Sequence, residues 1–258
     1  MRASQAERAN STGSAQTALA ARFHSVRSRD GVLRVGIVLV TACGVFLALL
    51  RLTSRQWLPT FDNALIWLRA LDVGTRSSPL VGPYSRFGWD HPGPAVYYVL
   101  AGPLRLLAGK PTGLLVGALL IGTICASGAA RFTLRNLGER SGMCIASGLA
   151  ILSWGLSDRL ISPWNPFVLV LPFALYIVCC WTWALGRDEA LPLLALAGAF
   201  CVQCHVGTTL VALTVFAVAA ALRVATRTPW NARFVWLSGA LTLGVWALAT
   251  MSAIALPV

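Results

Sequence analysis

The sequence predicts an all-α protein, a polytopic bundle of about seven transmembrane helices with interfacial helices in its first outer loop. Of its 258 residues, 57% are hydrophobic and only 12% are charged, whereas soluble domains carry roughly a quarter of charged residues. The mean hydropathy is +0.70. Apolar runs recur from residue 31 onward, and a helix of about 20 residues crosses a hydrocarbon core of about 30 Å. Lipid is therefore the expected main solvent of this chain.

Two domains are expected along the chain. Residues 1–30 are rich in Ala, Ser and Arg and hold too little apolar surface to order themselves, so they predict a disordered cytoplasmic tail. Residues 31–258 form one transmembrane domain, beginning with an uncleaved span at 31–50 that lacks a clear small-residue cleavage site. The later spans are expected at 112–130, 142–157, 166–186, 190–206, 208–224 and 234–257.

The apolar run 93–108 decides the topology. It holds Pro94, Pro103 and Arg105 and would reach only about 24 Å as a helix, so we expect it to lie in the interface. The arginines at 131–140, 187 and 223–233 then share the cytoplasmic side with the tail, as the positive-inside rule favours. The prediction is a multi-pass plasma-membrane protein with loops 51–92, 157–166 and 203–209 together on the extracytoplasmic side.

Charge, cysteines and histidines exclude several classes of function. The net charge of +12 comes mainly from arginines in the tail and connectors, where they set topology, so no nucleic-acid partner is expected. The seven cysteines lie in apolar runs and imply no disulfide framework. Three scattered histidines predict no metal site. Buried charge is expected to be nearly absent apart from Arg34, unlike the mid-membrane ionisable residues that are typical of a transporter.

The first candidate site residue is Asp62, at the start of an amphipathic pattern. Four charged residues spaced by 7, 3 and 4 share one stripe of a helix: Asp62, Arg69, Asp72 and Arg76. Leucines 65, 68 and 71 fall on another face, so the helix is expected to lie along the membrane interface. Asp62 is either the N-cap of this helix or a reactive carboxylate.

The segment 79–94 is rich in Gly and Pro and carries Arg86, Asp90 and His91 among aromatic residues. An arginine fork suits phosphate, and an interfacial histidine can donate to phosphate or move a proton. The five arginines of loop 51–90 also favour an anion on the outer side. The alternative is a rigid interfacial turn with solvated side chains.

Two further polar segments follow on the same side. In loop 157–166, Asn165 is suited to hydrogen-bond a sugar and Trp164 to stack on it, although Trp164 is also typical of an aromatic belt. Gln203 and His205 are either substrate contacts or a hydrogen-bonded helix terminus. Cys201, Cys204 and His205 match the attachment pattern of c-type haem, but both cysteines lie in an apolar run with no haem-wrapping domain after it.

The order of these motifs resembles the polytopic GT-C glycosyltransferases, especially actinobacterial mannosyl- and arabinosyltransferases. The motifs are Phe61-Asp62-Asn63, Leu68-Arg69, segment 79–94, Trp164-Asn165-Pro166, and Gln203 with His205. The resemblance implies a sugar donor on polyprenyl phosphate, an acceptor that is a cell-envelope glycan or lipid, and segment 93–108 against the polyprenyl chain and membrane lipids. It makes Asp62 the catalytic base. The implied substrate-binding residues are Arg69, Arg86, Asp90, His91, Trp164, Asn165, Gln203 and His205.

Two departures leave alternatives open. Asn63 stands where many members of this family have a second acidic residue, so no cofactor is assigned and a divalent metal stays an option. Family members also tend to continue through more spans and often an outer domain, whereas this chain stops at Val258. The chain is then a catalytic module without acceptor recognition, or a truncated inactive copy. A transporter or lipid-binding membrane subunit without catalysis is the alternative function.

Overall fold

A computed structural model describes the backbone of residues 57–85 and 87–254, with side chains as far as Ala247. The predicted tail 1–30, the predicted span 31–50 and Arg86 lie outside the described residues. Within the described part, the regular secondary structure is helical, together with an isolated antiparallel bridge between Tyr84 and Asp90. The all-α class is therefore confirmed for this part of the chain.

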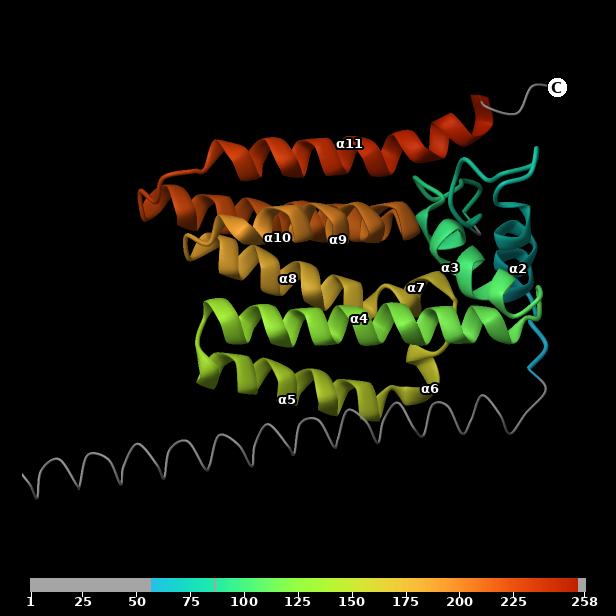
Figure 1. Cartoon of the computed structure of the whole chain (residues 1–258), viewed down its shortest axis with the longest axis horizontal. Coiled ribbons are helices and arrows are strands. Elements are labelled where there is room, and N and C mark those ends of the chain that lie inside the picture. The colour runs from blue at the N-terminus through green and yellow to red at the C-terminus, as the bar shows by residue number, and fades with distance from the viewer. Residues whose placement is uncertain (1–56, 86, 255–258) are drawn as a thin grey trace, which may run out of the picture.

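The helices form a bundle of long rods with shorter helices at one end (Figure 1). In chain order they are α2 (Asp62–Asp72), α3 (Ala95–Leu106), α4 (Thr112–Asn136), α5 (Glu139–Gly155), α6 (Ser157–Leu160), α7 (Asn165–Val168), α8 (Val170–Ala184), the 3-10 helix η1 (Asp188–Ala190), α9 (Leu191–Cys204), α10 (Gly207–Ala225) and α11 (Ala232–Ile254). We call one end of the bundle the polar end. It holds segment 57–111, which includes α2 and α3, and segments 156–169 and 205–206. The opposite end, with connectors 137–138, 185–190 and 226–231, is the basic end.

Three helical segments are long and apolar enough to cross a membrane: Thr112–Asn136, Asn165–Ala184 and Gly207–Ala225. This supports a membrane-associated chain. Two other apolar runs form shorter helices, since α5 has 17 residues and α9 has 14, or about 21 Å, whereas α11 has 23 residues. Helix α9 packs against α3, α8, α10 and α11.

The run 93–108 forms α3, a helix of 12 residues and about 18 Å. It packs closely on α4, because a Cβ at Gly113 would lie 2.6 Å from the Leu104 Cα. The Arg105 guanidinium donates to the Val73 carbonyl just after α2. Ile66 and Leu100 belong to the core cluster that joins α2, α3, α4 and the end of α9. The short helices of the polar end are thus fixed to the long ones.

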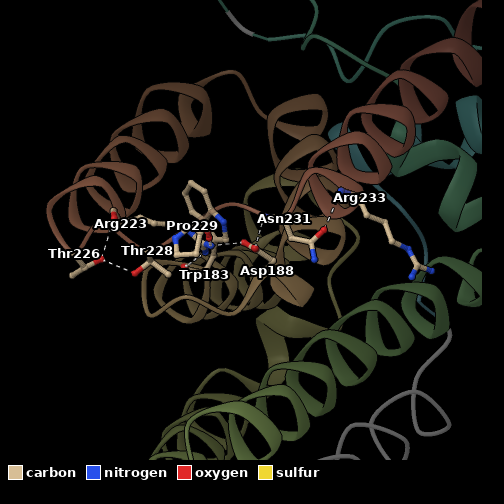
Figure 2. Close-up of polar contacts among 8 residues, drawn as sticks. All are labelled: Trp183, Asp188, Arg223, Thr226, Thr228, Pro229, Asn231 and Arg233. Atoms are coloured by element: carbon tan, nitrogen blue, oxygen red, sulfur yellow. Dashed lines mark hydrogen bonds and ion pairs between the residues drawn. The ribbon is translucent and has the colours of Figure 1, made fainter.

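The basic end holds a buried charge that the sequence did not predict. Arg223, expected in a solvated cytoplasmic connector, has a fully buried side chain (0% exposed) paired with Asp188 at 2.7 Å. Its guanidinium also donates to the carbonyls of Trp183 at 2.7 Å and Pro229 at 2.6 Å (Figure 2). The expectation that buried charge is nearly absent apart from Arg34 was therefore wrong. The carboxylate and two carbonyls compensate a charge that would otherwise be very costly to bury.

Candidate functional site

The carboxylate of Asp62 lies exposed at the polar end, at the first residue of α2. The N-cap is Phe61 and no side chain caps the helix, which excludes Asp62 as the capping residue. Phe61 has a φ of 48°, a left-handed conformation that a bulky residue adopts only at a cost of about 1–3 kcal/mol. The positive end of the helix dipole favours the Asp62 carboxylate. No sequence signal marks Phe61 for this backbone conformation.

Trp164 joins the Asp62 carboxylate to a segment 102 residues further along the chain. Its indole Nε1 donates to Asp62 Oδ2 at 2.8 Å. The half-buried indole packs edge-on against Phe167, with ring centroids 5.0 Å apart. Trp164 is therefore more than an anchor in an aromatic belt, because its N–H orients the carboxylate.

Asn165 connects the same segment to the end of α9. It is buried, and its Nδ2 donates to the Cys204 carbonyl at 3.2 Å. His205 follows in an extended conformation (φ −155°), which ends α9. The amide of Asn165 thus satisfies a carbonyl that the terminated helix leaves without a helical partner.

His91 and His205 form a ring pair between segment 79–94 and the turn before α10. Their ring centroids are 4.5 Å apart. The Val206 amide donates to His91 Nδ1 at 3.2 Å, and the Gly207 amide donates to His205 Nδ1 at 3.1 Å. Because each Nδ1 accepts a hydrogen bond, each neutral ring carries its hydrogen on Nε2.

Burial and charge both favour the neutral form of this pair. Burial lowers the pKa of His91, the neighbouring His205 lowers it further, and Asp90 opposes the shift. Burial also lowers the pKa of His205. The two rings are suited to hold backbone amides in place rather than to carry charge near pH 7.

Gln203 lies under segment 79–94. Its backbone carbonyl accepts from the Gly93 amide at 3.2 Å, and its side chain is 1% exposed. A Cβ at Gly93 would collide with the Gln203 side chain, so only glycine fits there. Among the described residues, the Gln203 Nε2 has no hydrogen-bond partner.

The remaining predicted site residues lie at the surface or outside the described residues. Arg69 is exposed and pairs with Asp72 at 3.7 Å, and Asp90 is exposed. Arg86 is not described. The predicted charged stripe is shorter than expected, because α2 ends at Asp72 and leaves Arg76 beyond the helix.

The buried face of α2 is formed by Ile66 and Ala70. Leu65 and Leu68 are 53% and 52% exposed. These two leucines therefore face away from the bundle.

The predicted residues thus fall into two groups. Asp62, Arg69 and Asp90 are exposed and Trp164 is half-buried, so a substrate can reach them. His91, Asn165 and Gln203 are buried and their hydrogen bonds join three segments of the polar end. Among the exposed residues, Asp62 offers the carboxylate. The Trp164 indole fixes its Oδ2, and a carboxylate held in this way is suited to accept a proton.

In the part of the chain that the structure describes, the geometry favours neither a metal cluster nor a haem site. Within the described residues, no three His, Cys, Asp or Glu side chains are grouped to hold a metal ion. Cys201 and Cys204 are fully buried in the core cluster of α2, α3 and α4. Their thiols are packed against protein and do not fit covalent attachment to a haem edge.

Comparisons with protein families, characterised proteins and solved structures give no match to this chain. The resemblance to GT-C enzymes therefore rests on the residues themselves.

Proposed function

We propose that this chain is a membrane glycosyltransferase of the GT-C type, which moves a sugar from a polyprenyl-phosphate donor to an extracytoplasmic acceptor. The observation that carries the proposal is the exposed Asp62 carboxylate, hydrogen-bonded by the Trp164 indole at the polar end of the bundle. When a sugar moves from a phosphate oxygen to a hydroxyl oxygen, a general base must take the hydroxyl proton. A carboxylate oriented in this way is suited to that role.

In the proposed reaction, an acceptor hydroxyl attacks the anomeric carbon of the donor sugar. The bond from this carbon to the acceptor oxygen forms as its bond to the phosphate oxygen breaks, with inversion at the carbon. Asp62 takes the hydroxyl proton, and polyprenyl phosphate leaves with the bonding electron pair. By resemblance, Arg86 would balance charge on the departing phosphate. Arg69 lies on the same helix as Asp62.

The buried group has a positioning role in this proposal. Asn165 holds the Trp164 segment to the end of α9, and His91 holds segment 79–94 to the turn before α10. Through Trp164, which neighbours Asn165, the first of these hydrogen bonds ties the Asp62 carboxylate to the end of α9. Preorganised loops favour catalysis because the reacting groups are already in place.

The proposal includes the seven-span topology. The predicted span 31–50, α4, α5, α8, α9, α10 and α11 would cross the membrane, while α2 and α3 would lie in the outer interface. The short length of α3 and the exposed leucines of α2 support this arrangement. The arginines of the basic end would then face the cytoplasm.

The test is a transfer assay on the full chain in detergent or nanodiscs. Radiolabelled sugar is supplied either on polyprenyl phosphate or on a nucleotide, together with a cell-envelope acceptor fraction. We expect labelled product from the lipid donor and none from the nucleotide donor. Product from the nucleotide donor alone, or from neither donor, contradicts the proposal.

A further inference from the structure

A second feature lies away from the polar end, between α8, α9, α10 and α11. A cavity of about 500 Å³ opens there. Its walls are almost entirely apolar, and the hydroxyls of Ser238 and Thr242 on its lining donate to carbonyls of their own helix. The cavity extends from Thr209, near the start of α10 at the polar end, to Trp183 and Trp230, near the end of α8 and just before α11 at the basic end. Its walls therefore suit an extended apolar chain along the bundle.

We propose that this cavity binds one acyl chain of an anionic glycerophospholipid, with the lipid phosphate at the basic end beside Arg227 and Arg233. The proposal does not depend on the transferase reaction, but it rests on the proposed position of the basic end at the cytoplasmic membrane surface.

The volume favours a single lipid chain over a protein helix. A helix is about 10–12 Å across, so a 20 Å length of it fills at least roughly 1,600 Å³. A methylene group is close in size to a water molecule, which takes about 30 Å³. A cavity of about 500 Å³ thus holds roughly 16 such groups, the length of one fatty-acyl chain.

The charge at the basic end selects the headgroup. Trp230 lines the cavity and is 52% exposed, and Arg227 and Arg233 lie three residues to either side of it, both exposed. A single arginine guanidinium can donate two hydrogen bonds to two oxygens of one phosphate. Basic side chains at a cytoplasmic membrane surface attract anionic lipids, and tryptophan is typical of that depth.

The wall near the headgroup is already formed. Trp183 stacks on Phe216 at 5.2 Å, meets Trp230 edge-on at 5.4 Å, and lies under the Arg223 guanidinium at 5.3 Å. The Arg223 guanidinium already binds the Asp188 carboxylate and two backbone carbonyls (Figure 2). It therefore supports the wall and does not bind the phosphate. The Trp183 Nε1 has no hydrogen-bond partner among the described residues.

Native mass spectrometry of the delipidated full chain, titrated with phosphatidylglycerol or phosphatidylcholine, tests the proposal. Wild-type protein should bind phosphatidylglycerol about tenfold more tightly than phosphatidylcholine. Gly239→Phe should weaken phosphatidylglycerol binding by about tenfold or more, because Gly239 lines the cavity and a Cβ there meets only open space.

Gly244→Phe is the matched control. Gly244 lies on the same helix with equally open space at its Cβ, but it does not line the cavity, so its lipid binding should equal that of wild type. If Gly239→Phe binds phosphatidylglycerol as wild type does, or if both glycine variants lose binding equally, the cavity is not the site.

The double variant Arg227→Gln, Arg233→Gln tests the headgroup. It should bind phosphatidylglycerol and phosphatidylcholine equally, whereas Arg135→Gln, an exposed arginine at the basic end of α4, should keep the preference. An unchanged preference in the double variant, or no preference in wild type, overturns the anionic-lipid assignment.

Discussion

At the scale of single residues, the polar end depends on atoms that a sequence pattern does not specify. The pattern predicted that Asp62, Trp164 and Asn165 would lie on one side of the membrane. In the structure, Trp164 donates to Asp62 and the adjacent Asn165 donates to the end of α9. It could not predict that the Trp164 N–H would bind the carboxylate, or that Asn165 would bind a backbone carbonyl. Such partners depend on the distances between segments far apart in the chain.

The histidine pair gives a prediction for pH. In the folded state burial lowers the pKa of His91 and of His205 below the ordinary value of 6.5. Between the lowered pKa of the folded state and the ordinary pKa of 6.5, the unfolded chain binds more protons than the folded one. The free energy of unfolding therefore rises with pH over this range and is greatest above about pH 6.5. Protonating Nδ1 also replaces the acceptor of the Val206 or Gly207 amide by a donor. The thermal unfolding midpoint of wild type should therefore fall between pH 7.5 and pH 5.

His91→Asn is the control for this effect. The asparagine oxygen can take the place of Nδ1 as acceptor for the Val206 amide, but it does not titrate. The variant should lose less of its unfolding midpoint between pH 7.5 and pH 5 than wild type. An equal loss in both proteins would show that the ring pair is not the titrating element.

At the scale of helices, hydrophobic runs predicted the long elements well. The expected run 208–224 is α10 at Gly207–Ala225, and the expected run 112–130 lies within α4 at Thr112–Asn136. The pattern missed α6, a single turn at Ser157–Leu160 within an expected loop. A four-residue helix has no periodicity for a pattern to detect, because it completes only about one turn.

The ion pair of the basic end should hold several of these helices together. The Asp188 carboxylate, in η1, pairs with Arg223 of α10 at 2.7 Å and accepts from the Asn231 amide, just before α11, at 2.8 Å. Asp188→Asn should cost about 3–5 kcal/mol of unfolding free energy, since it leaves a buried guanidinium uncompensated. Glu189→Gln, at an exposed neighbour, should change it by less than about 0.5 kcal/mol. Denaturation in mixed micelles measures both, and equal stability of the two variants would contradict a structural role for the pair.

At the scale of the whole molecule, the gathering of polar loops at one end follows from the alternation of helices. Helices α4, α5, α8, α9, α10 and α11 run back and forth, so loops 156–169 and 205–206 return to the end that carries α2 and α3 (Figure 1). Counting apolar runs was sufficient to predict this. The burial of Arg223 was not predictable in the same way, because its partner Asp188 lies 35 residues earlier, in the connector between α8 and α9.

Labelling with a membrane-impermeant thiol reagent tests the orientation. A cysteine at Asp158, exposed at the polar end, should be labelled in intact cells. A cysteine at Arg135, exposed at the basic end, should be labelled only after permeabilisation. The unsubstituted chain, with its own cysteines, sets the background. Labelling of the Arg135 position from outside would reverse the topology and place Asp62 on the cytoplasmic side.

The most direct test of the account is the transfer rate of Asp62→Asn. Asparagine keeps the size of the side chain and an oxygen that can accept the Trp164 N–H, so the fold should persist, but it cannot take the acceptor proton. Asp72→Asn, on the same helix, is the matched control. With a polyprenyl-phosphate donor, Asp62→Asn should lose about 10²–10⁴-fold in rate while Asp72→Asn stays near wild type. Turnover by Asp62→Asn at the wild-type rate would contradict the role of Asp62 as the catalytic base.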